Sequence, residues 1–324
     1  MVRDAKGAPR GVALAFVCLL LLGLMPIITN GRPAGFGALT FAVVFSAWQL
    51  LFSLPLLVLE WRSGERGMFR EALPPARRRR LLAITLFTGL LFALSTWAYV
   101  AAFEKAGSVN AAIALQAYPL CAAGLEALLF GRRKSRTELG FIALILIALY
   151  GLATQGKWQM SGLTPWFLVA LAVPVLWGVA HVILKELLVT TSITPNQVTT
   201  SRLVVTVLFL MPLALCIEGT GEIARAAAAL RLESFGLLMG LAYYLELVLW
   251  FNAVRQIDVS VASSITVPAP AVTMLFAWLL LGEEIHAFQL LALGLVGIGL
   301  LGLLGAGFRA RSPAGALRRG EARG

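Results

Sequence analysis

The chain has 324 residues, of which 59% are hydrophobic and only 13% are charged, and its mean hydropathy is +0.86. Soluble domains carry roughly 25% charged residues, so this composition excludes an ordinary soluble globule and indicates a polytopic membrane protein. A net charge of +11 would suggest a nucleic-acid partner in a soluble protein. In a membrane protein, the positions of the charges along the chain decide what they mean.

Ten segments have the roughly 20 apolar residues that a helix needs to cross a bilayer. Lipid offers no partners for unpaired backbone groups, and the runs are too long for barrel strands, so each is predicted to be a helix. In chain order they cover residues 11–28, 38–59, 81–103, 109–130, 138–155, 163–184, 196–218, 234–255, 259–281 and 286–307. The sequence therefore predicts an all-α polytopic membrane protein with ten transmembrane helices.

The basic residues predict how these helices are oriented. Most of the 27 lysine and arginine residues lie at the N-terminus, in the loops after even-numbered segments and in the tail. Cytoplasmic loops carry an excess of Lys and Arg, so both termini are expected in the cytoplasm, with residues 308–324 as a basic cytoplasmic tail. This distribution accounts for the net charge, and no nucleic-acid partner is expected.

A repeat divides the chain into two halves. Shifting the sequence by 151 positions places Pro119 on Pro270 and Gly131 on Gly282, inside apolar runs of equal length. Residues 11–155 and 163–307 each hold five predicted helices, an odd number, so the second half is expected to enter the membrane upside down. Inverted repeats of this kind are a recurrent transporter design, with the binding site near the membrane midplane.

These features resemble the EamA family of the drug/metabolite transporter superfamily. The resemblance is best at LLLGEEIHAFQLLALGLVGIGLLGLLG, Leu279–Gly305, where Gly-Glu precedes a Gln-Leu-Leu helix. The first-half copy departs from the family pattern, because Arg132 stands where Glu is usual. The resemblance implies secondary transport through a central cavity lined mainly by the third, fourth, eighth and ninth helices.

Prolines near the middle of two spans mark candidate cavity positions. Pro119 and Pro270 recur in both halves, and each removes one backbone donor and frees the carbonyl four residues earlier. For Pro270 the freed carbonyl belongs to Thr266. For Pro268 it belongs to Ser264. The functional interpretation is that these bends border the transport path, and the alternative is a purely structural kink.

Glu246 is the most informative single residue, because it lies about halfway along the eighth span. An ionisable group there is costly and normally faces the bundle interior or water. Tyr243 and Trp250 stand at helical spacings from it and share its face. Glu246 is interpreted as a proton-coupling or substrate-amine-binding carboxylate, or alternatively as a buried acid that serves packing.

Three further ionisable residues are predicted near the cytoplasmic ends of their helices. Glu126, His181 and Arg202 lie at similar depth and are candidates for a cytoplasmic gate. The alternative is snorkelling of Arg202 and separate hydrogen bonds for the other two. His181 has no second ligand at metal spacing, so no metal site is expected.

Aromatic and amide side chains in the same region suit a cavity for a small organic solute. Trp and Tyr also anchor helices at membrane interfaces, which is the structural alternative. The remaining candidates are Tyr99, Gln116 and Tyr118.

The predicted function is secondary active transport of a small organic metabolite across the inner membrane. An exporter of amino acids or related metabolites is favoured, with protons as a candidate coupling ion, and an importer of a vitamin-like or nucleoside-like solute is the alternative. An intramembrane enzyme is a remote alternative, because no HExxH, Cys-His pair or phosphate loop is present. GKWQMSG (156–162) and EGTGE (218–222) are predicted to be short turns between helices. No cofactor is expected, and the chain is expected to be a monomer or homodimer in membrane lipid.

Overall fold

The computed structural model describes residues 7–63, 75–118, 121, 124, 135–159, 164–256 and 265–311. All secondary structure in these ranges is helical, which confirms the all-α prediction. The first half contains α1 (Gly7–Gly31), α2 (Ala38–Arg62), α3 (Pro75–Ala106), α4 (Ser108–Leu115) and α6 (Arg136–Ala153). The second half contains α7 (Pro165–Thr190), α8 (Pro195–Ile217), α9 (Thr220–Ala228), α10 (Leu230–Gln256), α12 (Ala269–Phe276), the π-helix η3 (Ala277–Leu281) and α13 (Ala287–Arg311).

Six of the described helices are long and apolar enough to cross a membrane, namely α1, α2, α3, α6, α8 and α10. Shorter apolar stretches lie in α7, α12 with η3, and α13. Many large apolar side chains point away from the bundle, among them Leu208, which is 68% exposed, and Leu280, which is 63% exposed. Such a surface is stable in lipid rather than water, so the chain is an integral membrane protein.

One short helix was not predicted. The segment EGTGE was expected to be a turn, but α9 begins within it at Thr220 and continues to Ala228. The run that follows is rich in alanine, the strongest helix former, and Glu222 lies in the first turn, where the helix dipole favours an acid. The turn prediction was therefore wrong from Thr220 onward.

The helix ends follow local sequence signals. Thr164 and Thr194 cap the N-termini of α7 and α8, and Pro165 and Pro195 follow them at the first helical position, where proline removes no needed donor. Gly282 ends η3 in a left-handed conformation, φ +67°, that glycine adopts without strain. Gly282 thus closes its apolar run, as the repeat predicted.

The helices that carry the repeated prolines are interrupted. α4 ends at Leu115, and the next two residues form a tighter turn in which the amides of Gln116 and Ala117 bond to carbonyls three residues back. In the second copy, a turn at residues 267–268 precedes α12, whose first turn contains Pro270. Both spans therefore break at equivalent places, although Pro119 and Ser264 lie outside the described residues.

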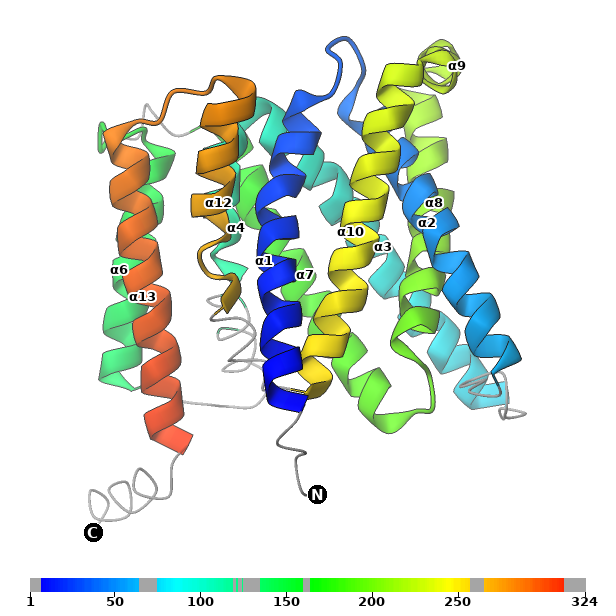
Figure 1. Cartoon of the computed structure of the whole chain (residues 1–324), viewed down its shortest axis with the longest axis horizontal. Helices are drawn as coiled ribbons and strands as arrows, with labels where there is room; N and C mark the ends of the chain where they lie inside the picture. Colours follow the sequence, from blue (N-terminus) through cyan, green and yellow to red (C-terminus); the bar gives the residue numbers. More distant parts are fainter. Residues whose placement is uncertain are drawn as a thin grey trace.

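Helix contacts repeat between the two halves (Figure 1). α1 packs on α10 and α3 packs on α7, while α2 packs on α10 and α3 packs on α8. In helix order, α1, α2 and α3 of the first half correspond to α7, α8 and α10 of the second half. Replacing each helix by its counterpart turns the α1–α10 contact into the α7–α3 contact and the α2–α10 contact into the α8–α3 contact. Three further contacts join a helix to its own counterpart, namely α2 with α8, α4 with α12, and α6 with α13. The start of α1 and the end of α13 lie at one end of the bundle, and α9 lies at the other, which we call the α9 end.

Glycines allow the closest helix approaches. A Cβ atom on Gly240 of α10 would lie 2.8 Å from both the Gln49 amide nitrogen and the Phe45 carbonyl oxygen of α2. Gly299 and Gly302 of α13 similarly face Ile145 and Phe141 of α6. Small residues at such crossings let membrane helices pack backbone against backbone. These contacts fix α10 against α2 three residues before Tyr243.

Candidate functional site

Aromatic and charged side chains from four helices and the segment after α4 converge inside the bundle. Phe92 and Tyr99 lie two turns apart on one face of α3, and Trp177 and His181 lie one turn apart on α7. The members of this group, which we call the central cluster, are Phe92, Tyr99, Tyr118, Trp177, His181, Arg202, Tyr243 and Glu246.

Arg202 of α8 is the cation of the central cluster. The residue is only 4% exposed, and its guanidinium lies 4.0 Å from the centre of the Phe92 ring. It also makes a polar contact with the Tyr243 hydroxyl and interacts electrostatically with Glu246. The direct ion pairs among the described residues do not include Arg202. Its positive charge is therefore stabilised by the Phe92 ring face, the Tyr243 phenol and the more distant Glu246 carboxylate.

His181 of α7 joins the same group through two rings. Its ring centre lies 5.5 Å from that of Phe92 in an edge-on arrangement. On its other side, Nδ1 lies 3.2 Å from the Tyr118 hydroxyl, and the two rings are also edge-on. His181 and Arg202 therefore both contact Phe92, whereas Glu126, the third residue of the predicted gate, lies outside the described residues.

Glu246 of α10 is the acid of the central cluster and is 7% exposed. The residue is ten positions before the end of α10, which corresponds to about 15 Å along the helix axis. Tyr99 and Tyr243 are close enough to interact electrostatically with its carboxylate, and the Cys18 thiol lies 3.6 Å from its backbone carbonyl. The carboxylate therefore faces the interior rather than lipid.

The structure gathers some predicted residues and separates others. Six candidates belong to the central cluster: Tyr99, Tyr118, His181, Arg202, Tyr243 and Glu246. Trp250 instead packs with Ala15 and Ala253 in a small separate cluster. Gln116 and Thr266 are half-buried, and Pro270 is buried. Glu126 lies outside the described residues, as do Pro119 and Ser264.

Sequence reasoning did not identify two aromatic residues of the central cluster or the buried polar side chains of α2. Phe92 and Trp177 carry no individual signal in an apolar run. Ser46 and Gln49 of α2 are buried, and Ser46 Oγ and Gln49 Nε2 have no hydrogen-bond partner among the described residues. The same holds for Trp177 Nε1 and Thr200 Oγ1. Polar residues at spacings of three and four within the second span could have marked this face.

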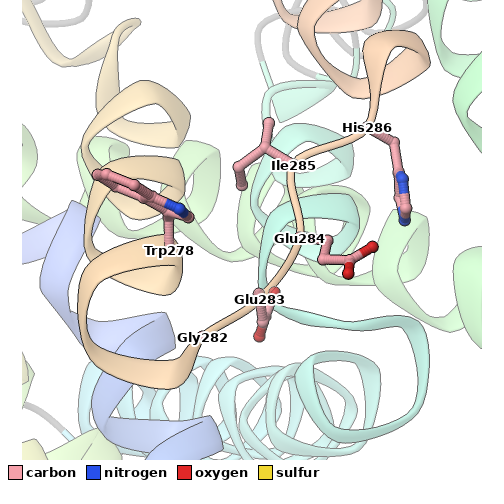
Figure 2. Close-up of a pocket in the computed structure, with 6 residues that line it drawn as sticks. All are labelled: Trp278, Gly282, Glu283, Glu284, Ile285 and His286. Atoms are coloured by element: carbon pink, nitrogen blue, oxygen red, sulfur yellow. The ribbon is translucent and has the colours of Figure 1, made fainter.

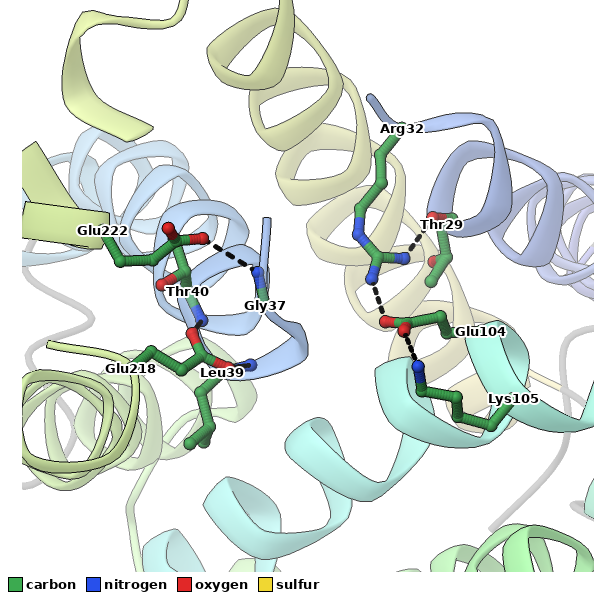
Figure 3. A network of polar contacts seen from close by, with 9 residues as sticks. All are labelled: Thr29, Arg32, Gly37, Leu39, Thr40, Glu104, Lys105, Glu218 and Glu222. Atoms are coloured by element: carbon green, nitrogen blue, oxygen red, sulfur yellow. Dashed lines mark hydrogen bonds and ion pairs between the residues drawn. The ribbon is translucent and has the colours of Figure 1, made fainter. Parts of the chain in front are cut away.

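Carboxylates hold the two halves together at the α9 end (Figure 3). The Glu218 carboxylate accepts hydrogen bonds from the Leu39 and Thr40 amides, at 3.0 and 2.8 Å. Glu222 accepts one from the Gly37 amide at 3.0 Å. These amides begin α2, where free N–H groups and the helix dipole favour an anion. Acids of the second half therefore cap a helix of the first half.

A second polar contact joins α4 to the loop after η3. The Ser108 hydroxyl donates to Glu283 at 2.7 Å, and Asn30 donates to Ser108 at 2.7 Å. Asn110 accepts a hydrogen bond from Gln289 of α13 at 2.9 Å. The α9 end is thus joined by regular hydrogen bonds between the halves.

A shallow surface pocket lies in the loop after η3 (Figure 2). It is lined by Trp278, Gly282, Glu283, Glu284, Ile285 and His286. None of these residues belongs to the central cluster. Within the described ranges, no group of three or more His, Cys, Asp or Glu side chains could hold a metal ion.

Comparison with known proteins identifies the fold and the family. The model of the EamA-like transporter family matches residues 9–154 and again residues 164–305. A solved crystal structure of a protein aligns with 94% of this chain and 99% of its own, at 17% identity and a TM-score of 0.58, which supports the fold alone. No curated protein matches the chain. Because the two family matches cover almost the whole sequence, the chain belongs to the EamA-like transporter family, of the drug/metabolite transporter superfamily.

Proposed function

We propose that this protein is a secondary active transporter that exports amino acids or related small metabolites across the inner membrane by alternating access. The observation that carries the proposal is the central cluster, in which the first half contributes aromatic groups and the second half contributes both aromatic and charged groups inside the bundle. Apolar walls with a few placed polar groups suit small organic solutes, and charged groups at this depth normally mark a transport path.

The proposed architecture is ten transmembrane helices in two inverted halves with both termini in the cytoplasm. The reciprocal helix contacts support the two-fold relation. In this orientation the α9 end faces outward, and Ser135 and Glu284 lie on opposite sides. Single cysteines at these positions in a variant lacking the three native cysteines should react with impermeant reagents from opposite sides. Reaction from the same side would contradict the inversion.

Glu246 is proposed to couple transport to protons, because a buried carboxylate can alternately hold a proton or face a positively charged group. The titratable groups around it are Cys18 of α1, Tyr99 of α3, Arg202 of α8 and Tyr243 on its own helix. If proton and substrate exchange on this carboxylate, an inward proton gradient drives substrate out.

Flux through reconstituted vesicles tests both parts of the proposal. Wild-type protein should move labelled amino acids faster with a pH gradient than without one, and the flux that remains in Glu246→Gln should not respond to the gradient. Glu233→Gln is the matched control, because Glu233 lies on the same helix but bonds to Trp48 at the α9 end. Flux of vitamins or nucleosides instead of amino acids would favour the alternative substrate class, and no flux of any solute would contradict transport.

A further inference from the structure

We propose that Arg202 and Glu246 bind the two charged ends of a zwitterionic α-amino acid with an uncharged side chain. Arg202 receives the carboxylate and Glu246 receives the ammonium group. This inference rests on the proposed transport function and assigns the binding residues and the substrate class.

Arg202 lacks the partner that its geometry fits best. A guanidinium presents five N–H donors in a planar fork that matches a carboxylate in a bidentate manner. In this structure its neighbours are the Phe92 ring face at 4.0 Å and the Tyr243 hydroxyl, and no described carboxylate forms a direct ion pair with it. A substrate carboxylate would supply the missing acceptor.

Glu246 is the complementary half of the site. It is buried and interacts electrostatically with Arg202, but the two side chains form no direct ion pair in the structure. In an α-amino acid the ammonium and carboxylate groups are attached to the same carbon. Such a molecule can give each protein charge its own partner.

The balance of charge selects a zwitterion over a simple anion or cation. An organic anion bound to Arg202 would also face the Glu246 carboxylate, and an organic cation bound to Glu246 would also face the guanidinium. Like charges in a site of low dielectric are strongly unfavourable. A molecule with both charges meets neither penalty.

Aromatic groups indicate the nature of the rest of the substrate. Tyr99 and Trp177 stand 6.2 Å apart between ring centres, and Tyr118 and His181 stand 5.9 Å apart. These rings offer apolar faces, and Trp177 Nε1 is a buried donor without a partner among the described residues. An uncharged side chain fits these walls, whereas a third charge would have no described counter-ion.

Calorimetric titration of the detergent-purified full chain with amino acids and matched analogues tests the assignment. The uncharged amino acids are titrated first, and the one that binds most tightly is compared with two analogues. For leucine these are 4-methylpentanoate, which lacks the ammonium group, and 3-methylbutylamine, which lacks the carboxylate. Wild-type protein should bind each analogue at least roughly 30-fold more weakly than the amino acid, because each leaves one buried charge unpaired.

The variants should remove these preferences one at a time. Arg202→Gln should lose roughly 30-fold or more in amino-acid affinity and should no longer prefer the amino acid over the amine. Glu246→Gln should show a similar loss and should no longer prefer the amino acid over the acid. Arg225→Gln and Glu233→Gln are matched controls at the α9 end and should bind like the wild type.

The analogue comparison in wild-type protein needs no variant, so a variant that does not fold leaves the proposal testable. Equal affinity for the amino acid and either analogue, or no binding of any uncharged amino acid, would overturn it. If either result occurs while vesicle flux of other solutes persists, transport stands and only the zwitterion site is wrong. A uniform loss for all three ligands in both variants would also overturn it, since that is what a purely structural role produces.

Discussion

The α9 end and the central cluster are built from opposite kinds of contact. At the α9 end, Glu218 and Ser108 make short, regular hydrogen bonds that cross between the two halves. In the central cluster, Arg202 rests on the face of Phe92, and its contacts with Glu246 act at a distance. The polar groups of the α9 end bond to one another, whereas Arg202 and Glu246 of the central cluster form no direct ion pair.

This difference separates holding the fold from binding a solute. Hydrogen bonds to backbone amides fix one geometry, because the donor and acceptor directions are specific. Ring faces and distant charges are less directional and can accept an inserted ligand. The α9 end should therefore respond to substitution mainly in stability, and the central cluster mainly in binding and flux.

The largest effect should come from a substitution in α10 that alters both helix packing and the central cluster. Gly240→Ala places a Cβ atom 2.8 Å from the α2 backbone, so α2 and α10 must move apart. Overpacking of this kind destabilises by about 1–3 kcal/mol, and it should also displace Tyr243 and weaken amino-acid binding. Thermal unfolding and calorimetric binding measure the two losses.

The matched control is Gly294→Ala on α13, where a Cβ atom would meet no neighbour within 4 Å. It should be neutral or stabilising by up to about 1 kcal/mol, because alanine favours a helix. If Gly240→Ala changed stability and binding as little as Gly294→Ala, the packing of α10 on α2 would not link the two regions.

A smaller effect confined to the α9 end is expected from Glu218→Gln. The amide keeps one acceptor but loses the charge that two amides of α2 share, and hydrogen bonds to a charged group contribute about 1.5–3 kcal/mol. The melting temperature should fall, while amino-acid affinity in the central cluster should stay the same. The exposed Glu284→Gln serves as control, and a loss of affinity without a loss of stability in Glu218→Gln would contradict the division.

The smallest effect should be a pH dependence at the same end. Partial burial of Glu222 opposes its ionisation, but hydrogen bonds from Arg225 and the Gly37 amide outweigh it and hold the pKa of Glu222 below its usual value of 4.5. Its contribution to stability is therefore complete above pH 4.5 and is lost as the pH falls through the lowered pKa. Melting curves of wild type and Glu222→Gln should differ at pH 7 and converge in acid. A constant difference would assign the effect to packing.

Sequence reasoning predicted the fold better than the site, for a physical reason. Apolar run length and the Pro-Gly spacing are local signals, so the helices and the repeat followed directly. The contact of Arg202 with Phe92 depends on how α8 and α3 are rotated about their axes, and the hydrophobic periodicity of these two spans does not report that rotation. Ionisable residues were found because they are rare at this depth, whereas Trp177 was missed because aromatic residues are common there. α9 was missed because a short alanine-rich helix carries little hydropathy contrast.

The contacts between counterpart helices have a consequence for assembly from separate parts. α2 with α8, α4 with α12, and α6 with α13 each join equivalent positions of the two halves. In the inverted arrangement that we propose, these are the isologous contacts that two half-length chains would form across a dyad. Splitting the gene between α6 and α7 should therefore yield two fragments that carry complementary faces. Co-expression of residues 1–159 with residues 164–324 should then restore a complex that neither fragment forms alone.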